Sequence, residues 1–333
     1  MTSTLIQGAQ GIFTGLPGEA MRATGAIRIV DGRIAAIGPL QREPGEQVID
    51  ASGCVVYPGL VSTHHHLFQC VLKGVRAAID SPLLVWLRAV PYAYWHKIDE
   101  DALRTAARIG LVELLLSGTT TSADHHYLFA DSYRFDPADV IFEVAEELGI
   151  RLVFCRGGAT KARGFDTPDI IPTPVEPIDT MIKSAEACAQ RHHDPSPDST
   201  RRVAFAPTTP PWSLAPDEPR MIAAAARRMG LRIHGHLSEP WPTWSFALPP
   251  MASGRSHGWP TTTTSDATCG LRISCTWTTT KSGCLPKPAP AWRIARNRIV
   301  GWARALLRRS DLQLWAAPSR LPSTARPRTS PPT

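Results

Sequence analysis

Two short motifs bring together side chains that bind metal ions and move protons. His64 and His66 lie in "STHHHLFQ", and His236 is followed three residues later by Glu239 in "LRIHGHLSE". Alternate residues of a strand face the same side, so His64 and His66 are expected to point together. Three neutral imidazoles bind Zn²⁺ or a similar divalent ion and leave one position for a water molecule, whose pKa falls to about 7. A carboxylate beside that water can accept its proton and pass it to a leaving group, which predicts this role for Glu239.

Other histidines compete for the same interpretation. A histidine triplet by itself also suits a solvated loop, but two motifs at the ends of expected barrel strands favour a metal site. His65 is expected to face away from the metal. His125 and His126 could reach the pocket, although packing or support behind the ligands is the preferred interpretation. His192 and His193 follow a helix and are expected to face solvent.

Gln69 and Arg156 are the candidates for binding a substrate. Gln69 lies one turn beyond the first ligands and suits either a hydrogen bond to a substrate carbonyl or a loop-packing amide. Arg156 ends an expected strand, where a charge is rare in a core, which favours a substrate contact or an ion pair. Trp86 in "PLLVWL" is typical of a core residue rather than a pocket wall.

The elements that position these residues alternate between strands and helices. Short apolar strands are predicted at 59–66, 119–126, 150–158, 201–209 and 231–239, and periodic helices at 99–118, 137–149, about 177–192 and 216–230. This alternation predicts a parallel sheet. Five such strands suit a (β/α)₈ TIM barrel whose strand ends line the active site. No Gly-rich loop follows the first strand, which argues against a dinucleotide-binding fold.

Residues 1–57 predict a separate small β layer. Their short apolar runs are punctuated by turns, and the Asp-Gly pair at 31–32 between two such runs predicts a hairpin. Residues 58–239 then hold the first five βα units of the barrel.

Composition changes abruptly after Glu239. The whole chain of 333 residues has a net charge of +7, but residues 240–333 hold 13 of its 36 basic and only 2 of its 29 acidic residues. Seven of the ten tryptophans also lie there. The first 239 residues are therefore acidic overall, and the last 94 are strongly basic.

Targeting and redox signals predict a cytoplasmic protein. No stretch of eighteen apolar residues is present, and "MTSTLIQGAQ" lacks the basic and apolar parts of a signal peptide. Seven cysteines without a CxxC pair suit reduced thiols better than a disulfide framework.

The first 239 residues resemble the amidohydrolase superfamily. The resemblance rests on "YPGLVSTHHHLFQ", "ELLLSGTTTSADHHY", "RLVFCRGGAT", "RRVAFAPTT" and "RIHGHLSE". More narrowly, these motifs resemble the aminohydrolases of cyclic amidines, such as 8-oxoguanine and isoxanthopterin deaminases. The resemblance implies one zinc or iron ion on His64, His66 and His236, Glu239 as the proton shuttle, a small heterocyclic substrate, and a possible homo-oligomer.

The family's sixth-strand His and eighth-strand Asp, the fourth protein ligand, have no counterpart, and a shifted reading frame accounts for this. If one base were lost near codon 240, each original codon would consist of the third base of one printed residue's codon and the first two bases of the next residue's codon. Residues 240–333 then permit "AHLV", "AHCPQSN" and "VDGAASNE", which resemble the family's sixth-, seventh- and eighth-strand motifs in order. Two forced positions agree: Trp259–Pro260 requires Ala and Trp277–Thr278 requires Asp. The recovered acidic ligand would fall at Thr324, so 240–333 is expected to be a disordered out-of-frame tail.

The sequence therefore predicts a metal-dependent hydrolytic deaminase acting on a purine- or pterin-like ring, impaired in this chain by the shifted frame. The barrel is expected to be incomplete, with about five of its eight strands. One alternative is a triazine chlorohydrolase or aminohydrolase of the same superfamily. The other is a binding protein whose Arg/Trp-rich tail contacts nucleic acid, which is disfavoured because the frame shift already explains the tail. Neither a nucleic-acid nor a membrane partner is expected.

Overall fold

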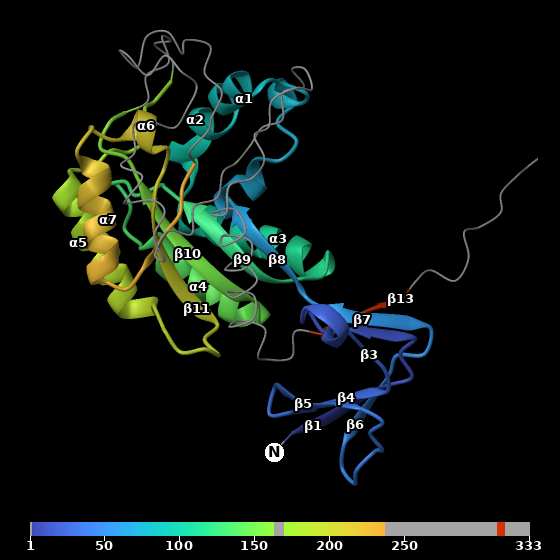
Figure 1. The fold of residues 1–333 in the computed structure, drawn as a ribbon. Coiled ribbons are helices and arrows are strands. Elements are labelled where there is room, and N and C mark those ends of the chain that lie inside the picture. Colours follow the sequence, from blue (N-terminus) through green and yellow to red (C-terminus); the bar gives the residue numbers. More distant parts are fainter. Residues whose placement is uncertain (1, 163–169, 237–311, 317–333) are drawn as a thin grey trace, which may run out of the picture. The chain divides into compact units, whose positions relative to one another are not determined.

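The computed structural model describes residues 2–162, 170–236 and 312–316 (Figure 1). The chain divides into two compact units: Met1–Gly59 with Leu307–Thr333, and Leu60–Leu306. The division falls close to the boundary expected after residue 57. Each unit has its own sheet structure and its own core.

The first unit is built from short strands in two sheets, ordered β5-β4-β1-β6 and β13-β7-β2-β3. The strands are β1 (Ser3–Gln7), β2 (Gly11–Phe13), β3 (Arg22–Ala23), β4 (Ala26–Val30), β5 (Arg33–Gly38), β6 (Gln47–Asp50), β7 (Cys54–Pro58) and β13 (Leu312–Ala316), and the 3₁₀ helix η1 (Gly18–Met21) precedes β3. Buried apolar side chains of both sheets share one core, which includes Ile6, Ile27 and Val56. This unit is the small β layer that the sequence predicts.

The predicted hairpin joins β4 to β5. The two strands pair antiparallel, and the connecting Asp31 and Gly32 have φ angles of 48° and 77°. Two consecutive positive φ angles are the geometry of a type I′ turn, which Asp-Gly favours because glycine has no Cβ and aspartate tolerates this region.

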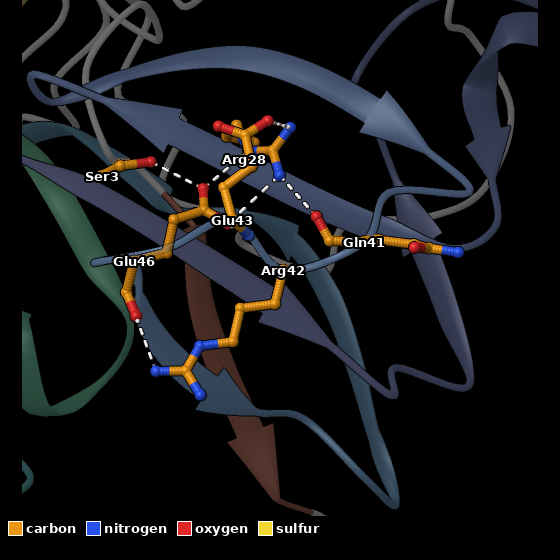
Figure 2. A network of polar contacts seen from close by, with 6 residues as sticks. All are labelled: Ser3, Arg28, Gln41, Arg42, Glu43 and Glu46. Atoms are coloured by element: carbon orange, nitrogen blue, oxygen red, sulfur yellow. Dashed lines mark hydrogen bonds and ion pairs between the residues drawn. The ribbon is translucent and has the colours of Figure 1, made fainter.

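Glu46 holds three segments of the first unit together (Figure 2). Its Oε1 accepts hydrogen bonds from Ser3 Oγ at 2.7 Å and Arg28 Nε at 2.6 Å, and its Oε2 accepts one from the backbone N–H of Glu43 at 2.8 Å. The Glu46 side chain is only 1% exposed. Because the Arg28 hydrogen bond and the other donors favour the carboxylate, they lower the pKa of Glu46 to about 2.

The second unit carries a five-stranded parallel sheet. Its strands are β8 (Leu60–His65), β9 (Thr119–His126), β10 (Arg151–Gly158), β11 (Arg201–Pro207) and β12 (Arg232–Ile233). They lie in chain order, each parallel to the next. This order is that of successive units of a (β/α)₈ barrel and lacks the reversal of a dinucleotide-binding sheet. The prediction of five strands of an incomplete barrel is confirmed.

One long helix follows each of the first four strands. These helices are α3 (Glu100–Leu116), α4 (Pro137–Leu148), α5 (Ile178–His192) and α7 (Glu218–Arg228). Local signals define their ends: Asp99 caps α3 by accepting the Ala102 N–H at 2.8 Å, and Gly149 ends α4 with a φ of 70°.

Shorter helical turns lie between β8 and α3 and between β11 and α7, and they were not predicted. They are η2 (Leu67–Leu72), η3 (Arg76–Ala78), α1 (Leu83–Ala89), α2 (Pro91–Tyr94), η4 (Trp95–Lys97) and α6 (Pro210–Ser213). Those between β8 and α3 escape prediction because turns of three to seven residues are too short to establish an apolar period.

The two faces of the sheet bury different side chains. Large residues such as Phe154 and Phe205 pack in one core with the four long helices. The opposite face carries a core of small residues, namely Ala123, Val153, Cys155, Ala204 and Ala206. Side chains alternate along a strand, so neighbouring residues of β9 and β10 face either the helices or this small-residue face.

The tail predicted for 240–333 lies outside the described residues, apart from Leu312–Ala316. The backbone of these five residues pairs antiparallel with β7. Within the described ranges, no helix has the length and apolar character needed to cross a membrane.

Candidate metal centre

Four histidines meet at the C-terminal end of the sheet. His64 and His66 lie at the end of β8, His125 lies in β9, and His236 follows β12. One ring nitrogen of each lies within 4.8 Å of those of the other three. The three predicted ligands are therefore brought together from strands that are 170 residues apart in sequence.

The Nε2 atoms of the three predicted ligands form a nearly equilateral triangle. The distances are 3.1 Å between His64 and His66, 3.2 Å between His66 and His236, and 3.1 Å between His236 and His64. Zn–N bonds of about 2.0–2.1 Å at tetrahedral angles place neighbouring nitrogens roughly 3.3–3.4 Å apart. The triangle thus has close to the size of one face of a tetrahedral zinc site, whose corners are three of the four ligand atoms.

Hydrogen bonds at the other ring nitrogens determine which nitrogen carries the proton. His66 Nδ1 lies 2.7 Å from the carbonyl oxygen of His125, and His236 Nδ1 lies 2.6 Å from that of Thr208. A carbonyl can only accept, so both Nδ1 atoms donate and both Nε2 atoms carry bare lone pairs. Two bare nitrogens 3.2 Å apart repel each other unless a cation or a proton lies between them. The residues therefore fit a divalent metal ion.

Burial keeps His66 and His125 in the neutral form that binds metals. Desolvation, with further contributions from neighbouring histidines, lowers the pKa of His66 and of His125 well below the ordinary value. The neighbouring His126, also fully buried, has a pKa of about 3 for the same main reason. Protons therefore compete little with a metal ion near neutral pH.

His125 also belongs to the cluster, beside the three predicted ligands. It is fully buried, and its Nε2 lies 3.2 Å from the carbonyl oxygen of Ala206. Its Nδ1 has no hydrogen-bond partner among the described residues. His126 faces the helix side, where its ring stacks on Phe154 and its Nε2 donates to the carbonyl of Leu128 at 3.1 Å. Strand alternation separates these two adjacent histidines.

His234 is a residue that the sequence interpretation missed. It is 7% exposed, and its Nε2 lies 2.8 Å from Nδ1 of His64. The signal was present, because His234 and His236 are two residues apart and so share a face, as do His64 and His66.

Asp124 anchors the chain just after the first ligands. Its Oδ1 accepts the backbone N–H of Leu67 at 2.7 Å, directly after His66. Complete burial raises the pKa of this carboxyl to about 7, and the Leu67 hydrogen bond opposes that rise.

A cavity of about 480 Å³ opens beside the histidines. His64 and His66 form part of its wall, together with Gln69, Trp86 and Val90. Gln69 thus lines this cavity, and its Nε2 donates to the hydroxyl of Tyr127 at 3.3 Å. The expectation that Trp86 is a core residue is wrong, because it is partly exposed and lines this cavity.

Arg156 is not brought to the cavity. Its neighbour Cys155 faces the small-residue side of the sheet, so Arg156 points towards the helices and is 1% exposed. Its guanidinium donates to both carboxylate oxygens of Glu176, at 2.6 and 2.8 Å, and to Ser184 Oγ at 2.8 Å. It also lies 4.0 Å from the ring centre of Phe129. Of the two roles left open by the sequence, the structure gives Arg156 the ion pair and not the substrate contact.

The remaining expectations divide. His65 lies outside the cluster of four, as expected. His192 does not face solvent: its side chain is 12% exposed, stacks on Phe142 and lies 2.6 Å from Asp139 Oδ1. His193 does not fully face solvent either. It is half-buried, and its Nδ1 accepts the backbone N–H of Val203 at 3.0 Å. Glu239 lies outside the described residues.

Comparisons with known proteins agree with this geometry. Residues 55–245 match the amidohydrolase family model. An isoxanthopterin deaminase from an unknown prokaryotic organism is 49% identical over 71% of this chain and 50% of its own length. The 8-oxoguanine deaminase of Pseudomonas aeruginosa is 34% identical over 74% of this chain and 54% of its own length.

One similar solved structure contains a bound zinc ion. The zinc complex of an atrazine chlorohydrolase from Arthrobacter aurescens TC1 matches with a TM-score of 0.61 and 30% identity, over 71% of this chain and 53% of that one. The chain spans about half the length of the curated relatives it matches. On the family match and these identities, the chain belongs to the amidohydrolase family.

Proposed function

We propose that the chain carries the metal-binding half of a hydrolytic deaminase that releases ammonia from a purine- or pterin-like ring. The convergence of three Nε2 atoms beside an open cavity carries this proposal. His64, His66 and His236 hold the cation. Zinc is the proposed metal, with iron as the alternative, because imidazole nitrogens in a tetrahedral set suit zinc. The zinc bound to the related chlorohydrolase supports this choice.

A divalent cation at this site supplies Lewis acidity, which lowers the pKa of a water molecule to about 7. The water oxygen bonds to the ring carbon that bears the exocyclic amine, and the C–N bond then breaks. Glu239, three residues after His236, takes a proton from the water and delivers it to the amino group, which leaves as ammonia. Gln69 offers an N–H and a carbonyl to the amide edge of the ring.

The proposed substrate class rests on the relatives and the cavity. The two curated relatives above are named as deaminases of isoxanthopterin and 8-oxoguanine, which are fused planar rings. Trp86 and Val90 provide an apolar wall for such a ring, and Gln69 provides the hydrogen-bonding group on the same wall.

We further propose a cytoplasmic location. The described cysteines, Cys54, Cys70, Cys155 and Cys188, are all buried free thiols, which supports a reducing compartment. The resemblance to oligomeric amidohydrolases supports a homo-oligomer of the complete enzyme, with neither nucleic acid nor membrane as a partner.

The test compares the 333-residue chain with a second version of the gene. In that version one base is added after codon 239, so that the following codons are read in the frame that encodes the family's sixth-, seventh- and eighth-strand motifs. Both are loaded with Zn²⁺ and supplied with isoxanthopterin, 8-oxoguanine, guanine and a chlorotriazine. We expect ammonia release from the pterin or purine by the restored chain. The activity should disappear with a chelator and return with zinc, and Glu239→Gln should remove it while zinc remains bound.

Two outcomes would redirect the proposal. Release of chloride or an alkylamine from the triazine, with no ammonia from any fused ring, would favour the triazine hydrolase. That alternative is supported by the 30% identity to the atrazine chlorohydrolase. Turnover that resists complete removal of metal would contradict the metal-dependent mechanism itself.

A further inference from the structure

His234 lies edge to edge with the ligand His64. Their rings are inclined by only 21°, with centres 5.0 Å apart, and His234 Nε2 is 2.8 Å from His64 Nδ1. The two nitrogens are much closer together than the ring centres, so both must lie on the line between the centres, which rings stacked face to face do not allow. The geometry is that of a hydrogen bond lying in the plane of both imidazoles.

The backbone places His234 there. Its N–H donates to the carbonyl of Phe205 at 2.9 Å, and the N–H of His236 lies 3.3 Å from the carbonyl of Thr208. Both bonds extend the pairing of β11 with β12 beyond the strand itself. The two histidines therefore leave the sheet edge on the same side, one at the metal triangle and the other behind it.

His64 is held differently from the other two proposed ligands. His66 and His236 donate their Nδ1 protons to backbone carbonyls, which no substitution can remove. His64 has a side chain at the corresponding position. The hydrogen bond at Nδ1 of His64 thus involves a replaceable side chain, whereas those of the other two involve the backbone.

The direction of this hydrogen bond matters for the metal. If His234 donated, the proton of His64 would sit on Nε2, facing the bare nitrogens of His66 and His236 at 3.1 Å. That proton would form hydrogen bonds within the triangle of nitrogens and would keep a cation out of it. If His64 donates from Nδ1, all three Nε2 atoms present a lone pair rather than a proton to a cation.

We propose that His234 is a positioning residue of the metal centre. Its Nε2 accepts the Nδ1 proton of His64, keeps the ring turned towards the triangle and leaves Nε2 free to bind a divalent cation. This inference rests on the proposed metal site. His234 itself touches neither the cation nor the substrate, because its Nε2 is occupied by His64 and it is not one of the four clustered residues.

The experiment measures Zn²⁺ affinity of the 333-residue chain by competition with a chromogenic chelator, together with the thermal unfolding midpoint without metal. His234→Leu removes the acceptor at similar size, and His234→Gln restores an acceptor oxygen. His126→Leu is the matched control, because this equally buried histidine faces the helices.

Loss of such an outer hydrogen-bond partner weakens metal binding by roughly 10- to 100-fold. We expect that loss for His234→Leu with one ion still bound, a return to within about threefold of the unmodified chain for His234→Gln, and no change for His126→Leu.

Each contrary result has a separate meaning. If the unmodified chain binds no zinc, the proposed function fails and the inference fails with it. If it binds zinc and His234→Leu binds equally well, the inference is overturned and the proposed function stands. A merely structural role is indicated if His234→Gln fails like His234→Leu and both lower the metal-free unfolding midpoint.

Discussion

At the scale of single residues, the candidate site depends on where protons reside. Carbonyl oxygens accept from Nδ1 of His66 and of His236, so their Nε2 atoms meet without hydrogens between them. Such an arrangement is unfavourable alone and favourable around a cation, because the metal takes up the lone pairs that would otherwise repel.

Replacing a proposed ligand should affect zinc binding far more than replacing the adjacent histidine. We expect His66→Gln to weaken zinc binding by more than the roughly 10- to 100-fold cost of losing an outer partner, because it removes a donor nitrogen. His65→Gln is the matched control, since His65 is adjacent and partly buried but lies outside the cluster. The measurement is zinc affinity by competition. Equal losses in both variants would contradict the assignment.

At the scale of elements, the site depends on how closely β9 and β10 approach. Gly157 of β10 lies beside the end of β9: a Cβ added there would lie 2.5 Å from the carbonyl oxygen of His126 and 2.8 Å from Cβ of Tyr127. The first of these is a backbone atom, which cannot move without displacing the strand that carries His125.

Gly157→Ala should therefore destabilise the second unit. Overpacking of this kind costs about 1–3 kcal/mol, and the displaced end of β9 should also weaken zinc binding. Gly11→Ala in β2 is the control, because no atom lies within 4 Å of its added Cβ. Chemical unfolding and zinc competition measure the two effects. An unchanged unfolding free energy for Gly157→Ala would show that β9 and β10 accommodate the added Cβ without cost, which contradicts the prediction.

Glu46 makes the first unit sensitive to acid. Its pKa is lowered to about 2 in the folded chain, mainly by the hydrogen bond from Arg28. A lowered folded pKa contributes stability above the unfolded value, near 4.5, and that contribution is lost as the pH falls towards 2.

Glu46→Gln should remove this pH dependence. The unfolding midpoint of the unmodified chain should exceed that of the variant above about pH 4.5, and the difference should shrink to zero near pH 2. Thermal unfolding of both chains across this range provides the measurement. A difference that stays constant with pH would mean that the charge of Glu46 contributes nothing to folding.

At the scale of the whole molecule, the described barrel sheet is open. In the part of the chain that the structure describes, β8 and β12 each have one neighbour in this sheet. A closed barrel needs further strands between them, and unpaired edges favour aggregation. The family match ends at residue 245, close to where the composition changes.

If the reading frame is shifted as we propose, adding one base after codon 239 should raise both solubility and deaminase turnover well above those of the 333-residue chain. The added strands would pair the open edges and supply the acidic ligand at the position of Thr324. Resequencing the DNA across codons 236–245 tests whether a base is missing there at all. Equal or higher turnover by the 333-residue chain would overturn the frame-shift interpretation.

Much of this molecule could be predicted from local pattern. The caps at Asp99 and Gly149 and the apolar periods between them specify helices, and the intervening apolar runs specify strands. Alternation along a strand also placed His64 and His66 together, and the position of His236 at the end of a later strand placed it at the same edge.

Local sequence patterns were enough to predict the order of the elements, the three clustered histidines and the break in composition after Glu239. Tertiary structure alone decided that His125 faces inward while His126 and Arg156 face the helices, and that His234 supports His64. The physical reason is that alternation specifies only which residues share a face. Which face receives the helices depends on how strands distant in the sequence pair and pack.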